Sequence, residues 1–266
     1  MLGAIIGDIA GSRFEFHNRR SKEFTLLHPK CYFTDDSVMS LAVCQALLRT
    51  APDFQNLDKE AVACMREVGQ PYPYCGYGGR FQRWMYMANP EPYHSYGNGA
   101  AMRVSGCGWA ARSLEEAKRL SEAVTAVTHD HPEGLKGAES TAAAIWLARS
   151  GKSKEEIRAY ITGNYYPIDF TLDGIRRTYR FHETCQDSVP QAFEAFFESA
   201  DFEDTIRNAV SIGGDSDTIA AIAGSVAEAY YGIPAGLREQ AAAYLDERLS
   251  EILTAFESKF PPKIAK

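Results

Sequence analysis

The chain has 266 residues, of which 45% are hydrophobic, and it carries 28 Lys and Arg against 35 Asp and Glu, for a formal net charge of −7. This composition is typical of a globular protein long enough to bury a sizeable core, and the negative charge disfavours nucleic acid or an anionic membrane surface as a partner. No apolar run approaches the roughly 20 residues that a membrane-spanning helix needs.

The N-terminal segment and the cysteines both favour a cytoplasmic protein. The segment MLGAIIGDIAG has no basic residue, and Asp8 interrupts its apolar stretch, so it is not typical of a signal peptide. The cysteines include no C-x-x-C pair, which predicts reduced and mostly buried thiols rather than a disulfide framework or a zinc site. They are Cys31, Cys44, Cys64, Cys75, Cys107 and Cys185.

The first half of the chain shows one weak strand signal and two helix signals. Residues 24–27, FTLL, are the best strand candidate, although the run is short. Residues 35–48 are apolar nearly all round and predict a buried helix. Asp58 is expected to cap a helix that ends at Gly69. The stretch 69–108 is rich in Gly, Pro and Tyr and predicts a long loop on the working face.

The second half is almost entirely helical in its patterning. Ser113–Glu116 and Ser153–Glu156 both have the sequence of a capping box, and the first helix is expected to end near Val127. Ser188 followed by Pro190 predicts a helix start. Residues 217–231 and 237–257 predict two more long helices. With no linker or repeat in the sequence, we expect a single all-α domain over residues 1–266.

Two acidic segments stand at helix starts. The first contains Thr34, Asp35 and Asp36, and the second contains Asp215, Asp217 and Thr218. Helix N-termini favour Asp, so capping residues in solvated turns are one interpretation. A cap needs only one carboxylate, however, and paired carboxylates near a core repel one another unless a cation offsets them. If the two segments meet, their oxygens would suit two divalent ions such as Mg²⁺ or Mn²⁺.

Five motifs in order give the chain a family resemblance. They are GDIAGSRFE at 7–15, FTDDS at 33–37, SYGNGAAMRV at 95–104, THDHP at 128–132 and GGDSDT at 213–218. With these motifs the chain resembles the ADP-ribosylglycohydrolase family, from about residue 3 to 232. The resemblance implies an all-α fold with two Mg²⁺ or Mn²⁺ ions in a cleft. The ligand sets it implies are Thr34, Asp35 and Asp36, and Asp215, Asp217 and Thr218.

Two positions depart from the usual family pattern. Ser37 stands where many members have Thr, and Ser216 replaces the Thr usual between the last two aspartates. Both substitutions keep a hydroxyl group, so we expect the metal site to be retained.

The glycine-rich motif implies a substrate-binding loop. Its two glycines permit close approach of the backbone to a ligand, and the resemblance implies contacts with the diphosphate and adjacent ribose, with Tyr96 against adenine. It also implies that His129 lies near the same groups, with a weaker case for His131. An ordinary tight turn and a surface histidine are the alternatives. The expected substrate-binding residues are Ser95, Tyr96, Gly97, Asn98, Gly99, Met102 and His129.

Two carboxylates are candidates for catalysis. Some family members place a Glu after the GD-x-x-G segment on a mobile loop that reaches the metals, and Glu15 matches that position. An exposed surface carboxylate is the alternative for Glu15. The resemblance therefore implies that Glu15 or Asp36 activates water or protonates the leaving group, whereas Asp8 is expected to tie down the N-terminal turn.

A second glycine-rich segment, at 75–80, has a less specific pattern. It lacks the Lys-Ser/Thr pair of a nucleotide P-loop, so we expect it only to border the cleft. For Arg80 and Arg103, phosphate contacts and structural salt bridges are equally open.

The function implied is hydrolysis of the bond between the anomeric carbon of the distal ribose of ADP-ribose and its acceptor. The acceptor would be an arginine or serine of a protein, or a small molecule. A metal-dependent phosphohydrolase of a nucleotide derivative and a non-catalytic ADP-ribose-binding protein are the alternatives. A purely structural protein is disfavoured because both acidic segments are complete. We expect a monomer.

Overall fold

The computed structural model describes residues 1–262, and these residues form a helical domain without strands. One isolated β-bridge joins Gly97 and Thr184. The all-α, single-domain prediction is therefore confirmed, while the predicted extension of the domain to residue 266 lies partly outside the described residues. No helix within 1–262 is long and apolar enough to cross a membrane.

The helices follow one another closely along the chain. They are α1 (Leu2–Gly11), η1 (Ser12–Phe14, a 3₁₀ turn), α2 (Asp35–Thr50), α3 (Leu57–Gly69), α4 (Gly79–Met85), α5 (Gly99–Met102), α6 (Ser105–Ala110), α7 (Leu114–Thr125), α8 (Pro132–Arg149), α9 (Lys154–Asn164), α10 (Leu172–Ile175), α11 (Cys185–Phe197), α12 (Phe202–Ser211), α13 (Ser216–Tyr231), α14 (Ala235–Ala242) and α15 (Glu247–Lys259).

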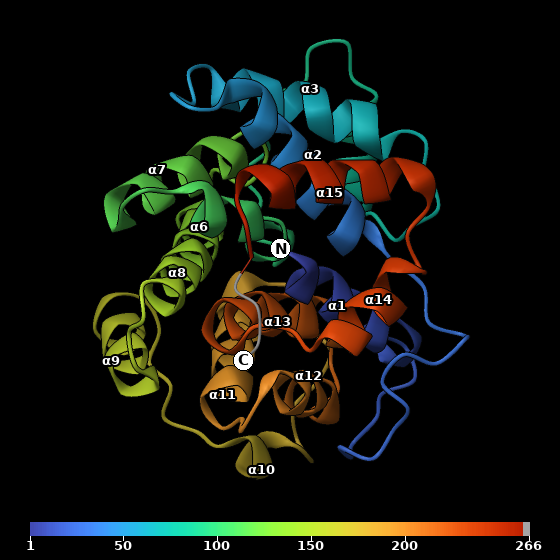
Figure 1. Ribbon diagram of the computed structural model, residues 1–266, viewed down its shortest axis with the longest axis vertical. Helices are drawn as coiled ribbons and strands as arrows, with labels where there is room; N and C mark the ends of the chain where they lie inside the picture. The colour runs from blue at the N-terminus through green and yellow to red at the C-terminus, as the bar shows by residue number, and fades with distance from the viewer. Residues whose placement is uncertain (263–266) are drawn as a thin grey trace.

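Helix α13 is the centre of the fold. Every residue from Ser216 to Ala229 is buried, because α1, α8, α11 and α12 surround the helix (Figure 1). A helix enclosed in this way is apolar all round rather than on one face. Its contact with α1 is the most extensive in the molecule and is closest at Gly7, where an added Cβ would lie 2.0 Å from the carbonyl oxygen of Ala220.

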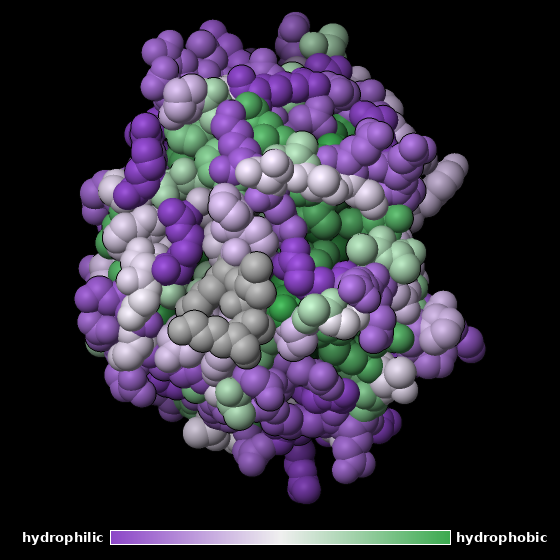
Figure 2. All heavy atoms as spheres, in the orientation of Figure 1, coloured by the Kyte–Doolittle hydropathy of each residue, from purple (hydrophilic) through white to green (hydrophobic). Residues whose placement is uncertain are grey.

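A second layer is built around α2, which packs against α3, α6 and α15 (Figure 1). Helix α2 also contacts α1 and α13, so the two layers meet where α2 and α13 begin. Figure 2 shows that the face carrying α14 and α15 is mostly hydrophilic, with hydrophobic side chains visible in the furrow between these helices. The meeting of the two helix starts positions the acidic segments described below.

Several predicted helices are confirmed together with their caps. The helices predicted from residue 35 and over 217–231 appear as α2 and α13. Ser153 and Glu156 form the complete predicted capping box of α9. Ser113 caps α7, but the Glu116 carboxylate accepts a bond from the backbone N–H of Arg112 rather than that of Ser113. Helix α7 ends at Thr125, two residues before the predicted Val127.

Three predicted boundaries were wrong. Asp58 does not cap α3, because the helix starts at Leu57 and Asn56 precedes it in the left-handed conformation. Helix α11 starts at Cys185 rather than near Ser188, since the bridge between Gly97 and Thr184 fixes its start. Pro190 therefore lies inside the helix. The helix predicted over 237–257 is divided into α14 and α15, because Asp246 accepts a bond from the N–H of Leu249 and caps a new helix.

Two segments differ in type from the prediction. Residues 24–27 form bends instead of a strand, with Phe24 packed edge-on against Phe14 at a centroid distance of 5.1 Å. The predicted loop 69–108 contains α4, α5 and α6, which are too short for a periodicity signal. Helices α1 and α8 were not predicted. Helix α1 is buried on every side and apolar nearly all round, and the many small buried residues of α8 give it a weak amphipathic pattern.

The prediction of free and mostly buried thiols is confirmed. All six thiols are free, and all are buried except Cys75, which is half-buried.

Candidate active site

The carboxylate of Asp8 holds the start of α2 in place from within α1. It accepts hydrogen bonds from the backbone N–H and hydroxyl of Thr34, at 2.9 and 2.7 Å, and from the N–H and hydroxyl of Ser37. Thr34 in turn caps α2 by accepting from the N–H of Asp36. Asp8 therefore ties α1 to the first acidic segment, and the prediction that it secures the N-terminal turn was wrong.

The second acidic segment is presented by a glycine turn before α13. Gly213 and Gly214 have φ angles of 69° and 75°, and a Cβ at Gly214 would lie 2.3 Å from the Tyr179 ring. Only glycine fits such a turn at low cost. The turn delivers Asp215 and Asp217 to the start of α13, and the Thr218 hydroxyl donates to Asp36 at 3.1 Å. The two acidic segments, far apart in sequence, therefore meet.

Two groups of carboxylates share Asp217. In one, oxygens of Asp8, Asp36 and Asp217 lie within 4.8 Å of one another, and in the other the same holds for Glu15, Asp215 and Asp217. Asp35 belongs to neither group. It is half-buried in the same cavity, and its Oδ1 lies 2.9 Å from the point where a Cβ on Gly76 would stand.

The crowding and burial of these carboxyl groups make their ionisation unfavourable. Burial is the largest cause, and neighbouring carboxylates add to it, so the pKa values of Asp35, Asp36 and Asp217 rise well above the usual value. Burial likewise raises the pKa of Asp215 to about 6, and burial with Asp217, Glu183 and Asp8 raises that of Glu15 to about 8. Within residues 1–262, no Lys or Arg forms an ion pair with any of them.

This donor set fits divalent cations. Asp36 Oδ1 and Asp217 Oδ1 are buried without a hydrogen-bond partner among the described residues, and such orphaned oxygens are costly unless something occupies them. Carboxylate and hydroxyl oxygens are the ligands of hard cations such as Mg²⁺ and Mn²⁺. The residues that could hold cations are Asp8, Glu15, Thr34, Asp35, Asp36, Asp215, Asp217 and Thr218.

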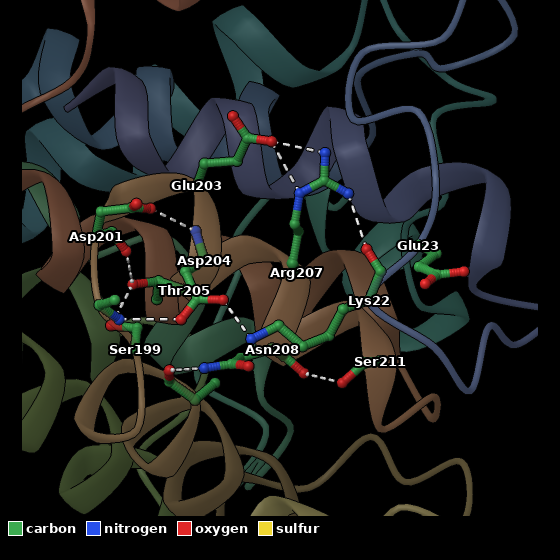
Figure 3. A network of polar contacts seen from close by, with 12 residues as sticks. Lys22, Glu23, Ser199, Asp201, Glu203, Asp204, Thr205, Arg207, Asn208 and Ser211 are labelled. Carbon is green, nitrogen blue, oxygen red and sulfur yellow. Dashed lines mark hydrogen bonds and ion pairs between the residues drawn. The ribbon is translucent and has the colours of Figure 1, made fainter.

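The segment that carries Glu15 is anchored on the second acidic turn. The Asn18 amide donates to the carbonyls of Phe14, Glu15 and Gly214, and its oxygen accepts from the N–H of Gly214 at 2.9 Å. Farther along, Arg207 of α12 donates to the carbonyls of Lys22 and Phe24, and Lys22 pairs with Asp204 (Figure 3). These contacts hold Glu15 at the cavity.

The glycine-rich loop forms the opposite wall of a cavity of about 450 Å³ that also contains the carboxylates. The Asn98 amide connects the two walls, because it donates to Asp215 Oδ2 at 2.7 Å and to Ser188 Oγ at 3.1 Å. Tyr96 is 45% exposed, with its ring 5.1 Å from that of His131. All the expected substrate-binding residues line this cavity, namely Ser95, Tyr96, Gly97, Asn98, Gly99, Met102 and His129; His131 does not line it.

The cavity also includes residues that sequence analysis did not single out or left open. Glu183 and Thr184 line it, and the only signal for them would have been their position before α11. The second glycine-rich segment borders it through Gly76, Gly78 and Gly79, as expected. Arg80 and Arg103 line it too, and neither forms a salt bridge among the described residues. Arg80 instead bonds to the carbonyl of Tyr93 and lies 4.8 Å above its ring.

Comparisons with known proteins agree on one family. A family model described as ADP-ribosylglycohydrolase matches residues 1–262. The chain is 26% identical to ADP-ribosylhydrolase ARH3 of Mus musculus, over 88% of this chain and 83% of that protein. It is 25% identical to ADP-ribosylarginine hydrolase Tri1 of Pseudomonas putida (strain GB-1), over 88% and 70%. A solved structure, "ADP-ribosylglycohydrolase-related protein complex", shares the fold with a TM-score of 0.72 at 24% identity, covering 97% of this chain and 95% of that chain.

Proposed function

The chain belongs to the ADP-ribosylglycohydrolase family, and we propose that it removes ADP-ribose from an ADP-ribosylated acceptor with the help of divalent cations. Its relatives identify it as a hydrolase acting on ADP-ribose glycosidic bonds. The observation that carries the metal dependence is the pair of carboxylate groups sharing Asp217. Among residues 1–262 no Lys or Arg pairs with them, and two of their oxygens have no hydrogen-bond partner.

We propose that the two ends of the cavity bind different parts of the substrate. The carboxylate end would hold the distal ribose, and the loop from Ser95 to Gly99 would hold the diphosphate, with Tyr96 against the adenine. The Asn98 amide bonded to Asp215 fixes the spacing between the ends. Precise spacing is a large part of catalysis, because it replaces a random encounter by a positioned one.

Cations bound by these carboxylates would offset the crowded negative charge, lower the pKa of Glu15 and polarise ribose oxygens. We propose that Glu15, rather than Asp36, takes the proton of the attacking water. No hydrogen bond among residues 1–262 holds the Glu15 carboxylate, whereas Asp36 is buried and accepts from the hydroxyl of Thr218. Water adds to the anomeric carbon, the bond to the acceptor breaks, and the acceptor leaves with that electron pair and takes up a proton.

A panel of defined substrates tests the function. Peptides carrying ADP-ribose on arginine or on serine, and small ADP-ribose derivatives, are incubated with the metal-free protein and with added Mg²⁺ or Mn²⁺. We expect metal-dependent release of free ADP-ribose from at least one acceptor, with Glu15→Gln and Asp217→Asn inactive. Release of AMP would instead indicate a phosphohydrolase, and ligand binding without any product would indicate a non-catalytic ADP-ribose-binding protein.

A further inference from the structure

A buried arginine without a carboxylate partner stands behind the glycine-rich loop. Arg103 follows α5 directly and is 1% exposed, yet no acidic side chain pairs with it within residues 1–262. Its Nη2 donates to the Thr128 hydroxyl at 2.6 Å, and its Nε has no partner among the described residues. The face of Phe81 lies 5.8 Å from its guanidinium. Such a charge is costly to bury, and the side chain that carries it lines the cavity.

The guanidinium of Arg103 contacts the ring of His129, which is itself buried, with 5% of its surface exposed. Its Nδ1 lies 2.7 Å from the Thr128 hydroxyl and 3.3 Å from Nη2 of Arg103. A guanidinium nitrogen can only donate, and the Thr128 oxygen that already accepts from Arg103 has its own proton free to donate. Both neighbours therefore present hydrogen to Nδ1, which must accept. A neutral ring then carries its proton on Nε2.

The other ring nitrogen points toward the glycine-rich loop. Nε2 of His129 lies 3.5 Å from where a Cβ on Gly97 would stand and 3.7 Å from the same point on Gly99. No hydrogen bond to it is present among the described residues. Arg103 and Thr128 thus hold the ring through Nδ1, and its Nε2–H is free to donate into the cavity. This N–H lies at the loop that is expected to contact the diphosphate.

We propose that Arg103 is a positioning residue that, with Thr128, keeps His129 neutral and protonated on Nε2, so that His129 donates to an anionic phosphate oxygen of the ligand. This proposal rests on the proposed function, because the diphosphate of ADP-ribose supplies that oxygen. A histidine held in this way gives a hydrogen bond of constant strength where an ordinary histidine would change charge with pH.

The charged surroundings of His129 support the neutral state. Burial is the largest cause that lowers its pKa well below the usual value, and the guanidiniums of Arg103 and Arg80 add to it. Arg103 stays protonated at neutral pH, with a pKa lowered by burial to about 10. The Tyr93 ring lies 6.1 Å away, and its phenol pKa is raised by burial, so it stays neutral. Asp130, the next residue, turns away and accepts from the N–H of His94.

Nitrogen NMR of protein labelled in its histidines reads the tautomer without any substrate. In the wild type we expect His129 to be neutral with its proton on Nε2 between about pH 5 and 8. In Arg103→Met, the Thr128 hydroxyl is free to accept from Nδ1, so we expect mixed tautomers and a ring that titrates within that range. Arg103→Lys keeps the charge and should restore the neutral ring. A wild-type ring protonated on Nδ1, or one that titrates, would overturn the proposal even if Arg103→Met failed to fold.

Calorimetric binding of ADP-ribose, and of ADP as a second probe, completes the test. We expect Arg103→Met and His129→Ala each to weaken binding by roughly tenfold or more, and in Arg103→Met the affinity should become pH-dependent. Arg149→Met is the matched control, since Arg149 is half-buried and, among the described residues, its hydrogen bonds go only to the carbonyls of Gly108, Trp109 and Ala111. It should change stability without changing the His129 spectrum.

The outcomes separate this proposal from the proposed function. If substrates are hydrolysed while His129→Ala binds ADP-ribose with wild-type affinity, only the role of His129 and Arg103 is wrong. If the wild type neither binds ADP-ribose nor releases it from any acceptor, both proposals are wrong.

Discussion

Replacing Gly7 by Ala tests whether the α1–α13 contact positions the carboxylates. The new methyl carbon would lie 2.0 Å from the carbonyl oxygen of Ala220, where ordinary contact begins at 3.4 Å. The obstacle is backbone, so the helices must separate by about 1 Å or more. Overpacking of this kind costs typically ~1–3 kcal/mol, and sometimes more, while Ala returns up to ~1 kcal/mol of helix propensity. We expect a net loss of about 1–2 kcal/mol, because the obstacle is backbone and the cost therefore lies in the upper half of this range.

The separation should also weaken metal binding. Asp8 follows Gly7 on α1, and Asp217 lies on α13, so moving the helices apart spreads the group formed by Asp8, Asp36 and Asp217. Urea unfolding gives the stability, and calorimetric titration with Mn²⁺ gives the affinity. Gly163→Ala is the matched control, because Gly163 lies in α9 and an added Cβ would have no described atom within 4 Å apart from its own helix backbone and chain neighbours. It should gain about 0.5–1 kcal/mol.

Equal stability of Gly7→Ala and Gly163→Ala would refute the close packing. A destabilised Gly7→Ala protein with wild-type metal affinity would show instead that the helix spacing does not set the geometry of the carboxylates.

Three further predictions concern the carboxylates directly. Asp217→Asn should abolish turnover and the rise in melting temperature on adding Mn²⁺, yet raise the stability of the metal-free protein. The reason is that burial and neighbouring carboxylates raise the pKa of Asp217, so this carboxyl group costs folding free energy that a neutral amide does not; a lower metal-free melting temperature would contradict this. The pKa values of Asp8 and Asp215, both raised by burial from 3.8 to about 6, mean that the folded state binds more protons than the unfolded state between these values. Stability of the metal-free protein should therefore fall as pH rises from about 4 to 6, by up to ~3 kcal/mol for each group, and urea unfolding across that range should show a downward slope that saturating Mn²⁺ flattens. Asn98→Ala removes the donor to Asp215, a bond to a charged group worth ~1.5–3 kcal/mol, so the KM for the substrate should rise about tenfold, whereas Asn164→Ala at the end of α9 should leave it unchanged.

The sequence alone determined the parts of this protein that depend on local chemistry. Helix periodicity and caps such as Ser153 with Glu156 are set by neighbours a few residues away, so they were predicted correctly. The acidic segments were also recognisable, because two carboxylates at one helix start exceed what a cap requires. Motif order was sufficient to indicate the family, which the match over residues 1–262 confirms.

Only the tertiary structure decided which of these residues face one another. From the sequence, we predicted that Asp8 acts locally in the N-terminal turn, because its actual partners, Thr34 and Ser37, lie more than twenty positions away. The sequence made Asp35 and Asp36 equivalent candidates, yet only Asp36 belongs to a group of three carboxylates that includes Asp217 among the described residues. For Arg103 the sequence left a phosphate contact and a structural salt bridge equally open, and its burial against His129 depends on packing between α4, α5 and the 128–131 segment. Such contacts depend on packing between elements that are far apart in the chain, and the hydrophobic periodicity of the sequence does not predict this packing.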